Sequence, residues 1–309
     1  MQKYDISQPI HLKKGIYELN RDPNFNYQLN RVINWDGGRL EDVAPIAAKI
    51  KTSADWKREL IALGDQAILE NRTANAIAYY RMSEFFMYDG DPDKKKYYSL
   101  ATEMFYAYYA DYFSGENPRI ERLSVPYESV SLPVMHVIPI GKSKGTLLVH
   151  GGNDSYYEEF LFSLLYLQEL GYEVYLFEGP GQGSVIRTQG MHFTHEWEKP
   201  TKAVLDQLNL NNVTIIGISL GGYLAPRAAA FDKRISRVIA WSIFPCFLDV
   251  LIGDENPAVQ KMFHFLLKIK AKAIINTIFN TLAKKEPVID WGLKHGMYTY
   301  EADSAYGYA

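Results

Sequence analysis

Between about residues 40 and 113, apolar side chains recur every three or four positions, as expected of helices that bury one face. One such series is Trp56, Leu60, Leu63 and Ala67. The series break at 52–53, 71–73 and 89–92, where Ser, Thr and Asp suit N-caps and a proline suits a first helical turn. The pattern therefore predicts four helices, the last of which ends near Phe113.

Beyond Pro118, apolar and polar residues alternate and β-branched side chains become frequent. Two runs joined by a short turn predict an antiparallel hairpin, Ile120–Pro126 and Val130–Ile140. Four short apolar runs follow: Thr146–His150, Glu173–Phe177, Val213–Ile218 and Arg237–Phe244. Because the first three precede a glycine-rich turn and a helical stretch, they predict an α/β fold with a doubly wound, mainly parallel sheet. The hairpin would form one edge of that sheet.

The change of period predicts a domain boundary near residue 117, between a helical domain of residues 1–117 and a second domain of residues 118–309. Helical periodicity returns from Pro245 to Lys285, where apolar residues surround much of the helix circumference. Such helices must bury more than one face. A helical lid of residues 245–309 over an apolar pocket, core packing and packing in a homodimer are all consistent with this pattern.

Charge and cysteine content narrow the class of protein. Lys and Arg number 33 against 36 Asp and Glu, a formal net charge of −3, and no run of like charge exceeds Lys94–Lys96. This balance argues against a nucleic-acid or anionic-membrane partner. The single cysteine, Cys246, excludes an intramolecular disulfide, and the first residues lack a signal-peptide core, so a cytoplasmic protein is expected. The longest apolar run, Val238–Gly253, is shorter than the roughly 20 residues that span a bilayer.

The main chemical motif is G-x-S-x-G, formed by Gly217, Ser219 and Gly221 between an apolar strand and an alanine-rich helix. A sharp strand-to-helix turn would raise the serine oxygen above the sheet, and the flanking glycines would avoid a clash. The N-terminus of the following helix would favour a developing oxyanion. We therefore predict Ser219 as a nucleophile with an uncommon positive φ; the alternative is a serine that only caps the helix.

A second glycine-rich loop, residues 150–154 (His-Gly-Gly-Asn-Asp), follows the strand that ends at His150. Its position predicts a backbone amide donated to the same oxyanion as the amide of the residue after the nucleophile. We assign the oxyanion hole to Leu220 and Asn153, with Gly152 as the substitute for Asn153. His150 is expected to shape the loop without acting as a base.

Two other motifs carry less chemistry. The loop at residues 178–184 spaces its glycines at intervals of two and follows the fourth strand, unlike a dinucleotide-binding loop, so we interpret it as a structural turn at the rim of the site. His192 and His195 lie next to acidic residues but read better as the entry to a helix than as a zinc site. Neither a metal nor a cofactor is predicted.

Taken together, the three loops that begin HGG, EGPGQG and GISLGG resemble those of the α/β-hydrolase superfamily. The helical region ahead of them resembles the group that contains acylaminoacyl-peptidase-like proteins, 2,6-dihydropseudooxynicotine hydrolase and the fermentation–respiration switch proteins. The resemblance implies a hydrolase in which Ser219 is the nucleophile and Asn153 supplies an oxyanion amide.

The acid and the histidine of a serine triad are expected after residue 244 in this superfamily. The residues present there include Asp249, His264 and His295, all in helical or lid-like sequence. Completing the sheet would take about two more strand–helix units of about 30 residues each. We therefore expect a C-terminally incomplete hydrolase domain that is nearly inert and that exposes an apolar sheet edge. A triad built from Asp249 with His264 or His295 is the alternative.

The function predicted from the sequence is that of a serine hydrolase acting on a small ester, an amide or acyl-peptide, or an activated C–C substrate. Its partners would be small molecules or short peptides. The alternative is a non-catalytic regulatory or binding protein that keeps the fold, because fold alone does not fix function.

Overall fold

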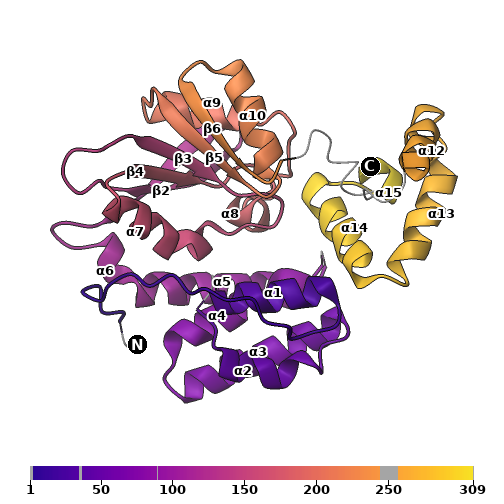
Figure 1. Cartoon of the computed structure of the whole chain (residues 1–309), viewed down its shortest axis with the longest axis horizontal. Coiled ribbons are helices and arrows are strands. Elements are labelled where there is room, and N and C mark those ends of the chain that lie inside the picture. The colour runs from indigo at the N-terminus through magenta and orange to yellow at the C-terminus, as the bar shows by residue number, and fades with distance from the viewer. Residues whose placement is uncertain (1–2, 35–36, 89, 244–256, 309) are drawn as a thin grey trace. The chain divides into compact units, whose positions relative to one another are not determined.

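The computed structural model describes residues 3–34, 37–88, 90–243 and 257–308. The chain divides into two compact units, which we treat separately (Figure 1). Unit 1 comprises residues 1–121 together with 158–170, and unit 2 comprises residues 122–157 and 171–309. The division between a first domain of residues 1–117 and a second of residues 118–309 stays a prediction.

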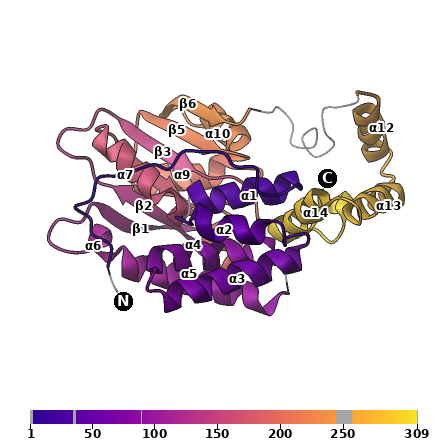
Figure 2. The ribbon, with the colours of Figure 1, turned by 60° about the horizontal axis from the view of Figure 1, so that its bottom comes forward.

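Unit 1 is helical. Its helices are α1 (Pro23–Asn34), α2 (Leu40–Ala47), α3 (Ser53–Leu69), α4 (Thr73–Ser83), the short 3-10 helix η1 (Glu84–Phe86), α5 (Pro92–Tyr108), α6 (Ala110–Phe113) and α7 (Leu161–Glu169). Consecutive helices α3, α4 and α5 pack against one another (Figure 2). The four helices predicted between residues 40 and 113 are confirmed as α2 to α5, although α1 and the short α6 were not foreseen.

The helix starts follow their capping residues. Thr52 accepts a hydrogen bond from the Asp55 amide while the Asp55 side chain accepts one from the Thr52 amide, which forms a capping box. Asp91 caps α5, and Pro92 occupies its first turn. These caps satisfy amides that have no partner within the helix, so they fix where α3 and α5 begin.

Unit 1 also holds a buried ion pair. The Arg31 guanidinium donates to both carboxylate oxygens of Glu159, at 2.9 and 2.7 Å. The two side chains are 7% and 0% exposed. Separating the pair would leave a buried charge uncompensated, which costs free energy. The bidentate pair therefore holds α1 against the segment that precedes α7.

Unit 2 is built on a six-stranded sheet with the order β1-β2-β4-β3-β5-β6. The strands are β1 (Ile120–Tyr127), β2 (Val130–Val137), β3 (Thr146–His150), β4 (Glu173–Phe177), β5 (Val213–Ile218) and β6 (Ile235–Trp241). Strands β3 to β6 run parallel, whereas β2 pairs antiparallel with β4. The mainly parallel sheet with the hairpin at one edge is therefore confirmed. The last strand is shifted: it begins two residues earlier than predicted and ends at Trp241, and residues 244–256 lie outside the described ranges.

The described helices of unit 2 are α8 (Gly183–Arg187), α9 (Glu198–Gln207), α10 (Gly221–Phe231), α12 (Pro257–Lys268), α13 (Lys272–Ala283), α14 (Pro287–Tyr300) and α15 (Ala305–Tyr308). Helix α10 packs on β5 and β6, with α9 beside it. Leu205 of α9 and Leu224 of α10 share one core with strand residues such as Ile215. This core fixes the carboxyl end of β5, where the serine motif begins.

Helices α12 to α15 bury a small core of their own. It contains Phe263, Leu266, Ile275, Phe279, Leu293 and Ala305. Part of the apolar pattern of residues 245–285 is thus explained by packing among these helices. Other apolar side chains here stay exposed, including Phe265 and Ile274. A role for these helices as a lid stays a prediction.

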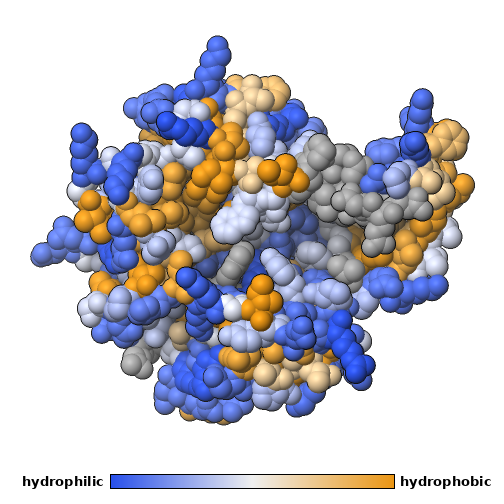
Figure 3. Space-filling model, viewed as in Figure 1, coloured by the Kyte–Doolittle hydropathy of each residue, from blue (hydrophilic) through white to orange (hydrophobic). Residues whose placement is uncertain are grey.

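Strand β6 forms an edge of the sheet within the described residues. It and its following residues expose apolar side chains: Val238 (39%), Ile239 (49%), Trp241 (62%) and Ile243 (86%). Apolar surface is visible on the sheet-bearing part and on the C-terminal helices in Figure 3. The predicted apolar sheet edge is confirmed, and such an edge is prone to pairing with other chains.

Candidate active site

Ser219 lies on a tight turn between β5 and α10. Its φ is 59°, so the predicted positive φ is confirmed. The Ser219 amide donates to the Trp241 carbonyl oxygen at 2.9 Å, and the Ser219 carbonyl oxygen accepts from the Gly222 amide at 2.8 Å. A left-handed conformation at a non-glycine residue costs about 1–3 kcal/mol, and it persists only where neighbouring contacts impose it.

The glycines around Ser219 are required by close backbone contacts. A Cβ atom added to Gly217 would overlap the Gly221 carbonyl, and one added to Gly222 would overlap the Ser242 carbonyl oxygen. A Cβ on Gly221 would lie 2.8 Å from the Gly151 carbonyl oxygen. The turn therefore excludes side chains on both sides of the serine, as a nucleophile elbow requires.

The loop after β3 lies directly against this turn. A Cβ added to Gly152 would lie 2.7 Å from the Leu220 nitrogen and 2.9 Å from the Ser219 Cβ. The contact follows from the topology, because β3 and β5 are parallel neighbours and their carboxyl ends meet at the same edge. The structure thus places Ser219, Leu220 and Gly152 next to one another, and their roles as nucleophile and oxyanion donors stay predictions.

The backbone amides of the two loops differ in availability. The Gly152 amide donates to the Ser155 hydroxyl at 2.9 Å, so it is already engaged. The amides of Leu220 and Asn153 make no hydrogen bond to any residue that the structure describes. Of the two alternatives for the second oxyanion donor, this arrangement favours Asn153 over Gly152.

Asn153 is held from the other side by α14. The Asn153 carbonyl oxygen lies 3.0 Å from His295 Nε2, and its side-chain oxygen accepts a hydrogen bond from the Thr299 hydroxyl at 3.2 Å. The His295 ring is buried and stacks on Trp291, with 5.2 Å between the ring centroids. His295 therefore contacts the loop after β3.

All seven histidines of the chain fall within the described ranges, and none of them hydrogen-bonds the Ser219 hydroxyl there. Asp249, which the sequence offered as an alternative acid, lies outside the described residues. The described part of the chain therefore contains a candidate nucleophile and candidate oxyanion donors but no histidine hydrogen-bonded to that nucleophile.

His150 is fully buried at the end of β3. Its Nδ1 lies 3.0 Å from the Gly151 carbonyl oxygen, and its ring packs against Phe177 and Trp197. Burial lowers the pKa of His150 to about 4, so the ring is neutral at physiological pH. This placement agrees with the expectation that His150 shapes the loop.

The loop at residues 178–184, which the sequence presented as a structural turn at the rim, contains a residue that contacts the loop after β3. Gln182 is 1% exposed, and its side-chain amide donates to the carbonyl oxygens of Gly151 and Gly152 at 3.0 and 2.7 Å. Its side-chain oxygen accepts a hydrogen bond from the Gly179 amide at 3.0 Å. No spacing rule identifies this residue, since Gly151 and Gly152 lie about 30 positions earlier in the loop after β3.

Glu178 organises the same loop. Its buried carboxylate accepts hydrogen bonds from the Tyr157 amide at 3.0 Å, the Ser184 amide at 2.9 Å and the Ser184 hydroxyl at 3.1 Å. Burial raises the pKa of the Glu178 carboxyl, partly offset by these donors. A Cβ on Gly183, whose φ is 37°, would overlap this carboxyl group. Glu178 thus connects the loop that follows β3 with the loop that follows β4.

Two further observations concern ligands and membranes. The Nδ1 atom of His192 lies 3.0 Å from the Tyr298 carbonyl oxygen, and across the described ranges no cluster of three or more His, Cys, Asp or Glu side chains is arranged to hold a metal ion. Each helix in those ranges is too short or too polar to cross a bilayer.

Residues 146–294 match the model of a family described as "Alpha/beta hydrolase family". The "Hydrolyase poxO" of Penicillium oxalicum is 30% identical over 273 residues, which cover 76% of this chain and 64% of that protein. The "Alpha/beta hydrolase psoB" of Aspergillus fumigatus is 29% identical over 321 residues, which cover 91% of this chain and 71% of that protein. This chain therefore spans less than two thirds of the length of poxO.

Two solved structures share the architecture. The 2,6-dihydroxy-pseudo-oxynicotine hydrolase superposes with a TM-score of 0.51 at 21% identity, over 76% of this chain and 70% of that one. AbyA5 superposes with a TM-score of 0.55 at 18% identity, over 69% of this chain and 61% of that one. At these identities, the likeness concerns the fold.

Proposed function

Because residues 146–294 match the model of an α/β-hydrolase family, we propose that the protein is a serine hydrolase whose nucleophile is Ser219. One observation carries the proposal: Ser219 adopts a positive φ while Gly152 packs against the Leu220 nitrogen. A serine that only capped a helix would need neither the strained backbone nor the second loop.

In the proposed reaction, the Ser219 hydroxyl attacks the carbonyl carbon of the substrate and forms a tetrahedral intermediate. The amides of Leu220 and Asn153 donate to the oxyanion, which stabilises the charge that develops in the transition state. A histidine takes the serine proton and passes it to the leaving group, and an acid orients that histidine. Water then hydrolyses the acyl-enzyme. This histidine and acid belong to no contact among the described residues, so they are part of the proposal.

The substrate class follows from the same chemistry. We include small esters, amides or acyl-peptides and activated C–C substrates, all of which pass through an oxyanion. The substrate would be a small molecule or a short peptide, and the net charge of −3 gives no support for a nucleic-acid partner. A cytoplasmic location, a lid formed by residues 245–309 and a homodimer are further parts of the proposal.

A non-catalytic binding protein on the same fold is the second candidate. The observation that favours it is that no histidine contacts the Ser219 hydroxyl among the described residues. Such a protein would retain the glycine contacts and the fold, but Ser219 would not be activated as a nucleophile.

Labelling with a fluorophosphonate separates the two candidates. The Ser219 oxygen of a serine hydrolase displaces fluoride from phosphorus, and the serine proton leaves through the base. Mass spectrometry of the native protein should find one phosphonylated peptide containing Ser219, and the Ser219→Ala variant should show none. Labelling elsewhere, or no labelling of the folded protein, would favour the binding protein.

A further inference from the structure

The side-chain amide of Gln182 is hydrogen-bonded to the backbone of the loop after β3, which we call the oxyanion loop (residues 151–154). Its nitrogen donates to two consecutive carbonyl oxygens, those of Gly151 and Gly152. Its oxygen accepts from the Gly179 amide in its own loop. Both N–H groups and the carbonyl of this side chain are thus used, in a site where the residue is 1% exposed.

The contact with Gly152 bears directly on Asn153. The Gly152 carbonyl and the Asn153 N–H belong to the same peptide group, which is planar and trans. When Gln182 fixes the direction of the carbonyl, it also fixes the N–H, which points the opposite way. Two glycines precede this peptide and would otherwise leave its plane free to turn.

The hydrogen bond also changes the strength of the donor. A peptide carbonyl that accepts a hydrogen bond is polarised, and its N–H becomes a better donor in a buried, low-dielectric site. The Asn153 N–H, like that of Leu220, has no hydrogen-bond partner among the described residues. Orientation and polarisation therefore act on the same group.

From these contacts we infer that Gln182 is a positioning residue of the oxyanion hole, which aims the Asn153 amide at the oxyanion. The inference rests on the proposed function, because it needs Ser219 to form an oxyanion. Gln182 itself does not touch the substrate. Its effect should appear in the rate of the chemical step rather than in ground-state binding.

Two variants separate positioning from simple support of the fold. Gln182→Met keeps the size of the side chain but removes both donors and the acceptor for the Gly179 amide. Gln182→Glu keeps the acceptor for the Gly179 amide and places a carboxylate oxygen against the two carbonyls. When that carboxyl is protonated it regains one donor, so part of the lost function should return as the pH falls.

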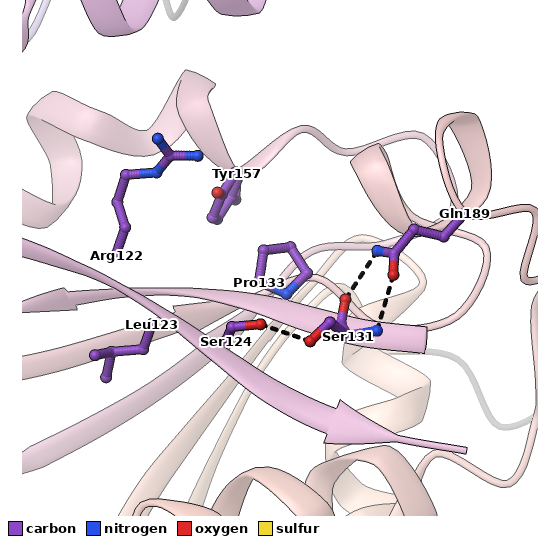
Figure 4. Close-up of a pocket in the computed structure, with 7 residues that line it drawn as sticks. All are labelled: Arg122, Leu123, Ser124, Ser131, Pro133, Tyr157 and Gln189. Atoms are coloured by element: carbon purple, nitrogen blue, oxygen red, sulfur yellow. Dashed lines mark hydrogen bonds between the residues drawn. The ribbon is translucent and has the colours of Figure 1, made fainter. Parts of the chain in front are cut away.

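Gln189 provides a matched control. Its side chain also makes two backbone hydrogen bonds, accepting from the Ser131 amide and donating to the Ser131 carbonyl oxygen, each at 2.8 Å (Figure 4). These bonds are on β2 and involve neither the loop after β3 nor the turn at Ser219. The Gln189→Met variant therefore loses two backbone hydrogen bonds, against three in Gln182→Met, without touching the oxyanion loop.

The experiment measures the rate constant of Ser219 phosphonylation in the native protein and in the three variants, at pH 5 to 8, alongside thermal unfolding. Losing one oxyanion donor costs about 100- to 1,000-fold, so a misaimed donor should slow Gln182→Met about 10- to 100-fold relative to Gln189→Met. The deficit of Gln182→Glu relative to wild type should shrink as the pH falls.

The outcomes are distinguishable. If the wild-type protein is not labelled at Ser219, the proposed function fails, and the positioning role fails with it. If wild type is labelled and folded Gln182→Met reacts as fast as Gln189→Met, only the positioning role is overturned. If Gln182→Met does not fold, the pH-dependent recovery of Gln182→Glu decides: a deficit that does not change with pH overturns the inference.

Discussion

His295 Nε2 lies 3.0 Å from the carbonyl oxygen of Asn153, and so joins the C-terminal helix α14 to the loop after β3. Since a carbonyl only accepts, the ring must carry its proton on Nε2 in this contact. The Thr299 hydroxyl, one turn later, bonds the Asn153 side chain at 3.2 Å. Two residues one turn apart on α14 therefore bond both the backbone and the side chain of Asn153.

Removing the His295 donor should loosen α14. We expect His295→Leu to leave the Asn153 carbonyl without its partner, which costs about 1–3 kcal/mol, and to speed proteolytic cleavage within residues 287–308. His295→Gln retains an N–H donor and serves as the control. Equal cleavage rates in the Leu variant and in wild type would mean that this bond does not hold the helix.

A methyl group at Gly152 should disable the site. In Gly152→Ala the new Cβ would lie 2.7 Å from the Leu220 nitrogen, so the loop or the turn must move. We expect Ser219 phosphonylation to slow by more than about 100-fold, comparable to losing an oxyanion donor. Gly145→Ala, whose Cβ would meet nothing within 4 Å, is the control and should react at the wild-type rate. Comparable rates in the two variants would show that the contact is unimportant.

Replacing Ser219 by glycine should stabilise the fold. The φ of 59° strains any residue with a Cβ, and glycine adopts it freely. We expect Ser219→Gly to unfold at a higher temperature than Ser219→Ala, with a free-energy difference of about 1 kcal/mol. Differential scanning calorimetry measures it. The two variants lack the hydroxyl equally, so a higher stability of the alanine variant would argue against strain at this turn.

Acid should destabilise unit 2 through His150. Its pKa is lowered to about 4 in the folded state, against an ordinary value of 6.5, so the unfolded chain binds a proton that the folded chain does not between these values. The stability present above pH 6.5 should therefore fall by about 3 kcal/mol as the pH drops to 4. Urea titrations at several pH values give the free energy of unfolding at each pH. This free energy should depend less steeply on pH in His150→Phe than in wild type. If the free energy of unfolding depends on pH equally in the two proteins, His150 is not the cause of the loss of stability in acid.

Replacing one partner of the buried pair of Arg31 and Glu159 should lower the free energy of unfolding more than replacing one partner of an exposed pair. Arg31→Met removes the bidentate pair with the Glu159 carboxylate, which is 0% exposed, and this costs about 3–5 kcal/mol. The control is Lys202→Met, which breaks an exposed pair with Asp206 and should barely change the unfolding midpoint. Chemical denaturation measures both. Similar effects in the two variants would contradict the importance of burial.

The local sequence was sufficient to predict most elements of the sheet. Strands β3, β4 and β5 match their predicted bounds because each apolar run is closed by glycine-rich sequence. Helix α1 was missed because it contains four asparagines, which are poor helix formers. Asn26 and Asn30 bond the backbone of the preceding segment, so their role depends on tertiary contacts that periodicity does not reveal.

The candidate site residues that belong to a local motif could be predicted from the sequence. Those that reach the site from distant parts of the chain could not. Ser219, Leu220 and the HGG loop follow from glycine spacing at strand ends. Gln182 and His295 reach the same loop from about 30 and 142 positions away, respectively, and nothing in their neighbouring sequence signals it. Their contacts depend on the parallel order of β3 and β4 and on the docking of α14.

Unit 1 is made of two stretches of the chain that are translated at different times. Arg31 leaves the ribosome 128 residues before its partner Glu159. At about 5–20 residues per second, the two are separated by roughly 6 to 26 seconds of translation. During that interval, helices α1 to α5 have emerged, but the carboxylate that neutralises Arg31 has not been made. The ion pair between Arg31 and Glu159 therefore cannot form until the strands β1 to β3 have also been translated.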